Sequence, residues 1–139
     1  MKLSKECRYG LDALTFLARE PAGTIVASAD LADTLDISPA FLSKILQRLA
    51  RAGIVRGHRG AVRGYALDRD PRAITVRAVA EVLDGDDLFA RCIFWSERCS
   101  QTHPCPLHPQ WARVRPQIER ELEELRLADL ASRARRRRR

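Results

Sequence analysis

The chain has 139 residues, of which 45% are hydrophobic, so it is long enough to bury one core and too apolar to be disordered throughout. Its net charge of +7 points to a polyanionic partner, but six arginines lie in residues 133–139, which leaves +7 less six, or only +1, on residues 1–132. We expect residues 132–139 to form a disordered basic tail, which either attracts phosphate without sequence preference or stays solvated. Because no run of about 18 apolar residues and no signal-peptide core is present, we expect a cytoplasmic protein without a membrane span.

Helical spacing of apolar residues predicts two helices in the first part of the chain. The first covers residues 3–19, with Ser4 as its N-cap. A short apolar piece then leads to Ser28, a second N-cap candidate, and the helix after it stops near Asp36. The short interval before the next helix is typical of a helix-turn-helix motif.

A third helix opens at Ser38 and Pro39, since Ser is a good N-cap and Pro suits the first helical position. Gly53 is placed to end it. Residues 54–56 and 65–67 then predict the strands of a two-stranded hairpin, joined by a turn rich in glycine and basic residues. Three helices followed by a hairpin indicate a winged helix-turn-helix domain over residues 1–70.

In this fold the third helix enters the major groove of DNA and the hairpin, or wing, contacts the backbone or a narrow minor groove. Lys44 suits guanine acceptors and Gln47 suits adenine. The alternative is that the basic residues only solvate the outer faces of a helix and a turn. The candidate DNA contacts are Ser38, Pro39, Ala40, Ser43, Lys44, Gln47 and Arg48 on the third helix, with His58, Arg59 and Arg63 on the wing.

The second half of the chain, residues 71–131, predicts a linker helix, a cysteine-bearing loop and a long dimerisation helix. Thr75 caps the linker helix, and residues 91–109 contain three cysteines and little periodicity. From Trp111 onward apolar residues again fall on one helical face, as far as Leu130 near the end. Pro116 marks either a kink or a delayed start of this helix. The fold class is therefore mainly α with a small β-hairpin wing.

Cys92, Cys99 and Cys105 are separated by six and five residues, with His108 following. Thiolates are soft ligands suited to iron–sulfur clusters, zinc or copper(I), and these gaps are longer than the close pairs of zinc fingers. Free or redox-paired thiols are the alternative. The fourth ligand is open: His108 is close in sequence, whereas Cys7 would have to arrive by folding or from a partner subunit, and is otherwise a small buried hydrophobe.

These features together resemble the Rrf-type winged-helix regulators, a family that includes IscR, NsrR and RsrR. The resemblance covers nearly the whole chain before the arginine tail. It rests on the opening residues 1–10, on Ile37-Ser38-Pro39-Ala40-Phe41-Leu42-Ser43-Lys44-Ile45-Leu46, on Gly64-Tyr65-Ala66-Leu67, on the three cysteines with Pro104-Cys105-Pro106-Leu107-His108, and on Leu127-Ala128-Asp129-Leu130.

The resemblance implies a homodimer on a palindromic DNA operator, with a [2Fe-2S] or [4Fe-4S] cluster held by Cys92, Cys99 and Cys105. His108 matches the fourth ligand of the IscR branch. The NsrR branch instead takes an acidic N-terminal ligand from the other subunit, and in that neighbourhood this chain offers Cys7, with Arg8 beside it. The first cysteine gap is one residue longer than in the IscR branch, the wing lacks the usual glycine run, and Ser43-Lys44 replaces an acid and an amide. Operator and signal therefore do not transfer.

The functional expectation is a DNA-binding transcriptional regulator, more specifically a repressor, that senses redox state, nitric oxide or iron supply through an iron–sulfur cluster. The alternative is a zinc- or thiol-switch regulator of the same fold without a cluster. An enzyme is not expected, because the sequence contains no phosphate-binding loop, no nucleophile motif and no paired carboxylates.

Overall fold

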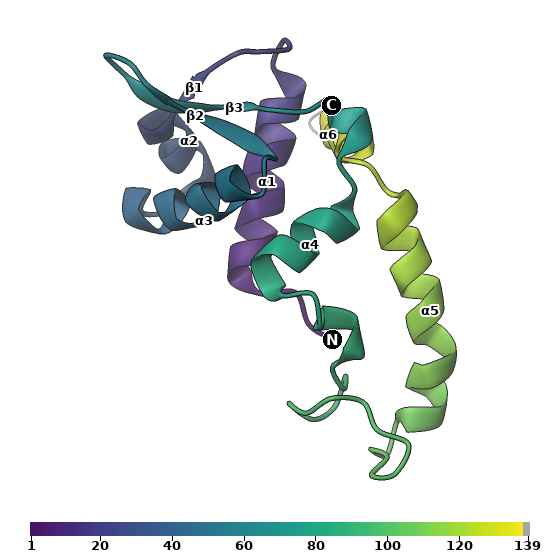
Figure 1. Cartoon of the computed structure of the whole chain (residues 1–139). Helices are drawn as coiled ribbons and strands as arrows, with labels where there is room; N and C mark the ends of the chain where they lie inside the picture. Colours follow the sequence, from purple (N-terminus) through teal and green to yellow (C-terminus); the bar gives the residue numbers. More distant parts are fainter. Residues whose placement is uncertain (138–139) are drawn as a thin grey trace.

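The computed structural model describes residues 1–137, a mainly helical chain with a small antiparallel sheet of strand order β1-β3-β2 at one edge (Figure 1). The elements follow one another as α1 (Lys5–Arg19), β1 (Val26–Ala27), α2 (Ser28–Leu35), α3 (Pro39–Arg51), β2 (Val55–Arg59), β3 (Arg63–Leu67), the 3-10 helix η1 (Pro71–Ala73), α4 (Val76–Asp84), the 3-10 helix η2 (Leu88–Ala90), α5 (His108–Glu124) and α6 (Leu127–Arg137). This arrangement confirms the predicted mainly α fold with a β-hairpin wing.

Helix α1 lies at the centre of the molecule and packs against α2, α3, α4 and α6. Ser4 caps it as predicted, because its Oγ accepts a hydrogen bond from the N–H of Cys7 at 3.0 Å. Gly10 permits the close packing: a Cβ there would overlap a methyl of Leu83 on α4 and lie 3.3 Å from Ile45 on α3. The N-terminal helix therefore joins the recognition helix to α4.

The predicted helix-turn-helix is present, with α3 as its second helix. Asp36 ends α2 in the left-handed conformation at φ 53°, which Asp tolerates better than most residues. Ser38 accepts a hydrogen bond from the N–H of Phe41 at 3.2 Å, and Pro39 occupies the first turn. Gly53, just past the C-cap, has φ 73°, the conformation for which glycine is preferred at helix ends.

The sheet has three strands rather than the predicted two. The apolar piece before α2 forms β1, in which Val26 pairs with Tyr65 and Ala27 with Gly64. Ala27 is therefore the N-cap of α2 and Ser28 its first residue, so the prediction of Ser28 as the cap is wrong. The hairpin strands also run further toward the wing tip than residues 54–56 and 65–67, because β2 and β3 continue pairing as far as Arg59 opposite Arg63.

One hydrophobic core crosses the predicted domain boundary at residue 70. Buried residues of α4, η2 and α6 belong to the same cluster as those of α1, α2 and α3. The backbone N–H of Val76 donates to Leu125 at 2.9 Å, and that of Leu127 donates to Ile74 at 2.9 Å. These bonds hold the start of α6 against the start of α4, and α5 contacts α4, while the cysteine loop extends from one end of the molecule (Figure 1).

The single helix predicted from Trp111 to Leu130 is two helices, α5 and α6, separated at Leu125. The break occurs because the backbone of residues 125 and 127 bonds to the α4 segment instead of continuing the helix. Helix α5 begins at His108, and Pro116 lies inside it, so Pro116 does not delay the start.

Part of the tail expected to be disordered is helical, since α6 continues to Arg137, and the remainder of that tail lies outside the described residues. Among residues 1–137, no helix combines the length and apolar character that a bilayer crossing requires.

Candidate functional site

A groove of about 1090 Å³ separates α3 from the β2–β3 hairpin. Six of the ten candidate DNA contacts line it: Pro39, Ser43, Gln47, His58, Arg59 and Arg63. Arg51, which is not among the ten candidates, also lines the groove; it follows Gln47 by four residues and therefore lies on the same helical face. The fold thus brings the exposed face of the recognition helix and the wing to two sides of one basic groove.

The wing tip concentrates positive charge. Arg59 and Arg63 are directly opposite in the antiparallel register, and both are exposed. Like charges opposite one another destabilise a strand pair unless an anion neutralises them. A phosphate of a DNA backbone provides such an anion. The opposed arginines therefore favour nucleic-acid binding, although they destabilise the hairpin when no anion is bound.

Two candidate contacts on α3, Lys44 and Arg48, are engaged by α1. The Lys44 Nζ lies 2.9 Å from Glu6 Oε1, and Arg48 Nη1 lies 2.8 Å from Glu6 Oε2. Arg48 also donates from Nη2 to the carbonyl of Val82 on α4 at 2.9 Å. The Lys44 ammonium, and more weakly Arg48, hold the pKa of Glu6 below its usual range.

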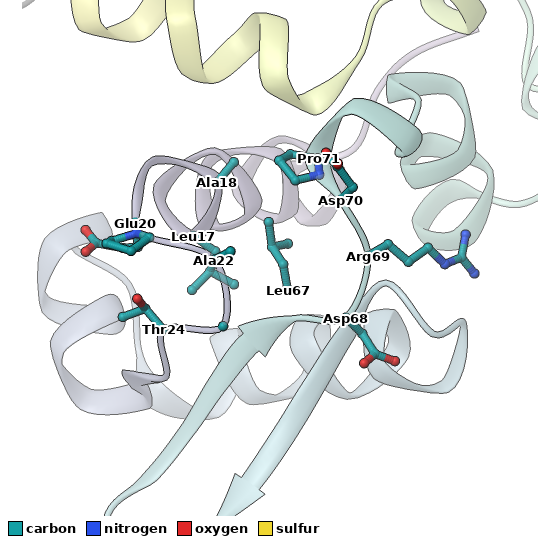
Figure 2. Close-up of a pocket in the computed structure, with 12 residues that line it drawn as sticks. Leu17, Ala18, Glu20, Ala22, Thr24, Leu67, Asp68, Arg69, Asp70 and Pro71 are labelled. Atoms are coloured by element: carbon teal, nitrogen blue, oxygen red, sulfur yellow. The ribbon is translucent and has the colours of Figure 1, made fainter.

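A second hollow of about 410 Å³ lies at the other end of the sheet, between the end of α1 and the segment after β3 (Figure 2). Leu17 and Leu67 form its apolar side, and Glu20, Asp68 and Asp70 are at its rim. The predicted site residues lie elsewhere, so this hollow is not part of the expected DNA or metal chemistry.

The cysteine loop connects η2 to α5 and folds back on itself. The N–H of Cys99 donates to Ala90 at 2.7 Å, and the N–H of Cys92 donates to Glu97 at 2.8 Å. The Cys92 Sγ in turn accepts hydrogen bonds from the N–H groups of Phe94 and Trp95, each at 3.3 Å. This backbone arrangement brings the first two cysteines to the same end of the loop.

Two of the remaining donors meet directly, because Cys99 Sγ lies 3.3 Å from the Nδ1 of His108, the first residue of α5. Cys105, like Cys92, is a buried free thiol. The N–H of Trp95 lowers the pKa of Cys92, while burial and the neighbouring Cys92 raise that of Cys105. Within residues 1–137, no three His, Cys, Asp or Glu side chains are already arranged to hold a single metal ion.

Two observations fit this loop to a soft metal group. Its donor set is three thiols and one imidazole, the ligand types that iron–sulfur and zinc centres use. The indole Nε1 of Trp111 is buried and has no hydrogen-bond partner among the described residues. Trp111 lies three residues after His108, on the same face of α5, and an N–H donor in that place suits a sulfur acceptor.

Cys7 has the properties of a core residue. Its side chain is fully buried on α1, and burial, with a smaller effect of Asp84, raises its pKa to about 12. Geometry separates the two candidate donors: His108 Nδ1 lies 3.3 Å from Cys99 Sγ, whereas Cys7 lies among the buried residues of the central hydrophobic cluster.

Residues 3–133 match the Rrf2 family, described as "Iron-dependent Transcriptional regulator". The chain is 32% identical to the HTH-type transcriptional regulator CymR of Bacillus subtilis over 95% of this chain and 91% of that one. It is 30% identical to IscR of Yersinia pseudotuberculosis, over 95% and 80%. Among solved structures, that of CymR, titled the global cysteine regulator of B. subtilis, matches with a TM-score of 0.80 at 29% identity, covering 95% of this chain and 97% of that one. T. potens IscR matches with a TM-score of 0.73 at 30% identity, over 96% and 88%.

Proposed function

The chain belongs to the Rrf2 family of transcriptional regulators, and we propose that it represses transcription as a homodimer whose DNA affinity depends on an iron–sulfur cluster in the cysteine loop. The signal is redox state, nitric oxide or iron supply, each of which alters such a cluster. The observation that carries the proposal is the pairing of Cys99 with His108 at the first residue of α5, which joins the expected ligand set to the expected dimer helix.

The DNA-binding half of the proposal uses the groove between α3 and the wing. With α3 in the major groove, Ser43 and Gln47 reach base edges, and the amide of Gln47 is already oriented by a 3.1 Å hydrogen bond to Ser43. Arg59 and Arg63 at the wing tip then meet backbone phosphates or enter the minor groove. Two such reading heads in a homodimer match a palindromic operator.

The dimer half of the proposal uses the exposed face of α5. Trp111 is the one buried residue of α5, whereas Val114 is exposed and Ile118 and Leu122 are half-buried. These residues recur at helical spacing and form a stripe, of which Trp111 is buried and Leu122 packs against the core of this chain, while Val114 is exposed and Ile118 is half-buried. The α5 helix of a second copy would bury the accessible part of this stripe, as a dimer interface requires.

The cysteine loop would hold the cluster through Cys92, Cys99, Cys105 and His108, and the bound cluster supplies a redox- and nitric-oxide-sensitive centre. The backbone N–H groups of residues 94 and 95 stabilise the Cys92 thiolate, and the Trp111 indole is available to donate to a sulfur. Release of His108 or Cys99 would free the start of α5. Because α5 forms the dimer interface in this proposal, its movement would change the spacing of the two reading heads.

The test is anaerobic purification followed by visible absorbance and assays of iron and acid-labile sulfide. Duplexes selected from a random-sequence library then report the affinity of the loaded and the cluster-free protein. We expect cluster in the wild type and in Cys7→Ala, its loss or altered spectrum in Cys99→Ala and His108→Ala, and different operator affinities for the two forms. Equal affinity of the two forms would contradict sensing through the cluster.

The second candidate is a zinc or thiol switch in the same loop, favoured by the contact of the Cys99 thiol with the His108 imidazole, two groups that zinc sites use and that also suit a reactive thiol. It predicts stoichiometric zinc, or a reversible thiol–disulfide change, without visible absorbance or sulfide. The same purification therefore separates the two candidates.

A further inference from the structure

We propose that Glu6 sets the DNA affinity of the recognition helix: it pairs with Lys44, and this ion pair must break before the Lys44 ammonium can contact DNA. The inference rests on the proposed role of Lys44 as a DNA contact. Glu6 itself lies on α1 and is not among the residues that line the DNA groove.

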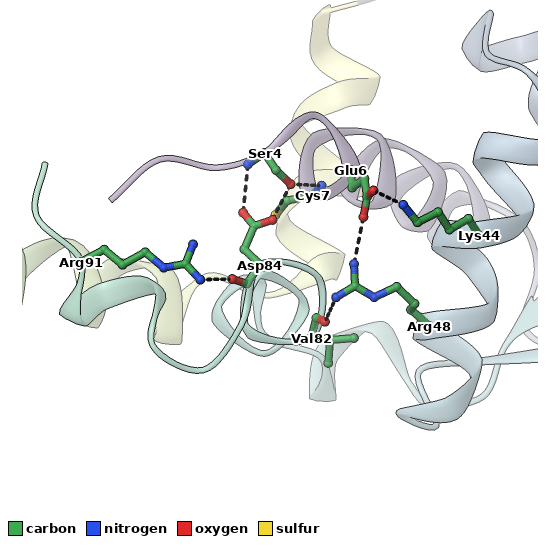
Figure 3. Close-up of polar contacts among 8 residues, drawn as sticks. All are labelled: Ser4, Glu6, Cys7, Lys44, Arg48, Val82, Asp84 and Arg91. Carbon is green, nitrogen blue, oxygen red and sulfur yellow. Dashed lines mark hydrogen bonds and ion pairs between the residues drawn. The ribbon is translucent and has the colours of Figure 1, made fainter. Parts of the chain in front are cut away.

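The carboxylate of Glu6 is placed between two basic side chains of α3 (Figure 3). Each of its oxygens takes one of them: Oε1 pairs with Lys44 Nζ at 2.9 Å, and Oε2 with Arg48 Nη1 at 2.8 Å. Lys44 and Arg48 are four residues apart and therefore share a helical face, which α1 approaches with its first turn. One carboxylate thus controls two of the basic groups predicted to bind DNA.

The two partners are held differently. Arg48 has a second anchor, its 2.9 Å hydrogen bond to the Val82 carbonyl, and its side chain is 35% exposed. It therefore ties α3 to both α1 and α4 and is a positioning residue. Among residues 1–137, Glu6 is the one polar partner of Lys44, whose side chain is 64% exposed, so Lys44 can leave Glu6 at little cost, as exposed ion pairs contribute little.

Because Arg48 is anchored twice and Lys44 only by Glu6, the Lys44 side chain can occupy two positions. In free protein its ammonium rests on Glu6, and on the operator it can move to a base edge or phosphate while Arg48 keeps Glu6 in place. On any other sequence the gain is only a phosphate contact, and Lys44 must still give up Glu6 to make it. Because Lys44 must give up Glu6 in either complex, the pair lowers affinity for the operator and for other DNA alike, including the phosphate contacts that supply most non-specific binding.

The test uses Glu6→Gln, Lys44→Ala and the double variant in the full chain, purified anaerobically. Their affinities for a fluorescent random-sequence duplex are measured as salt rises from about 50 to about 200 mM, a span over which one phosphate contact changes affinity about threefold. Asp70→Asn is the matched control, because it removes the same charge from another exposed ion pair, with Arg72, at the end of the sheet away from the wing tip. Urea unfolding checks that each variant is folded.

We expect Glu6→Gln to bind the random duplex more tightly than Asp70→Asn does, and its salt dependence to steepen by about 0.9 per protomer. The double variant should bind like Lys44→Ala, since without Lys44 there is no charge to release. Operator affinity should rise in Glu6→Gln as well, because the same ion pair no longer has to break in that complex.

Two results overturn the inference in different ways. If Lys44→Ala weakens binding but Glu6→Gln matches Asp70→Asn, Lys44 contacts DNA and Glu6 does not control it. If Lys44→Ala leaves affinity and salt dependence unchanged, the proposed DNA contact of Lys44 is wrong, and the inference fails with it. Should Glu6→Gln unfold more readily than the wild type, the comparison of Lys44→Ala with Lys44→Arg still decides whether Lys44 donates charge to DNA.

Discussion

Replacement of Cys7 by alanine separates a core role from a ligand role. Cys7 is fully buried on α1, where its backbone N–H is held by Ser4 and its thiol lies within the central hydrophobic cluster. We expect Cys7→Ala to lower stability and to leave the metal content of the protein unchanged. His108→Ala should do the opposite, because His108 lies beside Cys99 at the start of α5.

The size of the stability loss follows from the buried sulfur, which is comparable to a methylene group. Removing that much apolar material costs about 0.8 kcal/mol in transfer free energy. A residual cavity on the order of 20 Å³ adds about 0.5 kcal/mol at roughly 24 cal/mol per Å³. The total of about 1.3 kcal/mol corresponds to a fall of about 4 °C in Tm, given an unfolding entropy of roughly 0.3 kcal/mol/K for a chain of this length.

The assay has two parts. Thermal unfolding is measured on cluster-free protein, and iron, sulfide and visible absorbance are measured on anaerobically purified protein. Cys7→Ser is the companion variant, since it keeps the volume but buries a hydroxyl, and it should also retain the metal group. Loss of iron and sulfide from Cys7→Ala, at unchanged folding, would refute the reasoning and make Cys7 a ligand. An unchanged Tm would instead mean that the core around α1 closes on the vacated space.

Two further predictions concern the recognition helix. Ser38→Ala should destabilise the protein by about 1 kcal/mol, because the N–H of Phe41 loses its cap, whereas Ser38→Asn should restore most of the loss in the same denaturation measurement. Glu6 should make the stability of the protein depend on pH, because Lys44 and Arg48 hold the pKa of its carboxyl below the ordinary value of 4.5 in the folded state. Its contribution to the free energy of unfolding is therefore complete above that value, and it is lost as the pH falls through the lower folded-state pKa. Unfolding free energies measured between about pH 3 and pH 6 should therefore fall more steeply in the wild type than in Glu6→Gln, and parallel curves would contradict this.

Local signals were sufficient for much of the winged helix. Ser4, the Ser38-Pro39 start of α3 and Gly53 act where the sequence predicts, since a cap needs only the backbone N–H groups of its own turn. Strand β1 escaped prediction because two residues carry no periodicity, and it forms only by pairing with Tyr65 and Gly64. The break at Leu125 escaped prediction because its cause, hydrogen bonds to Ile74 and Val76, lies fifty residues away in the chain.

The sequence by itself determined the family, the winged helix and the cysteine-bearing loop, because these depend on residue types and spacings within short segments. Tertiary structure decided which polar groups meet. It placed Cys7 in the core and His108 beside Cys99, and it paired Lys44 and Arg48 with Glu6. These contacts depend on how α1 packs against α3 and α4. A charged side chain is positioned by partners that are distant in the sequence, so a local sequence pattern does not predict its contacts.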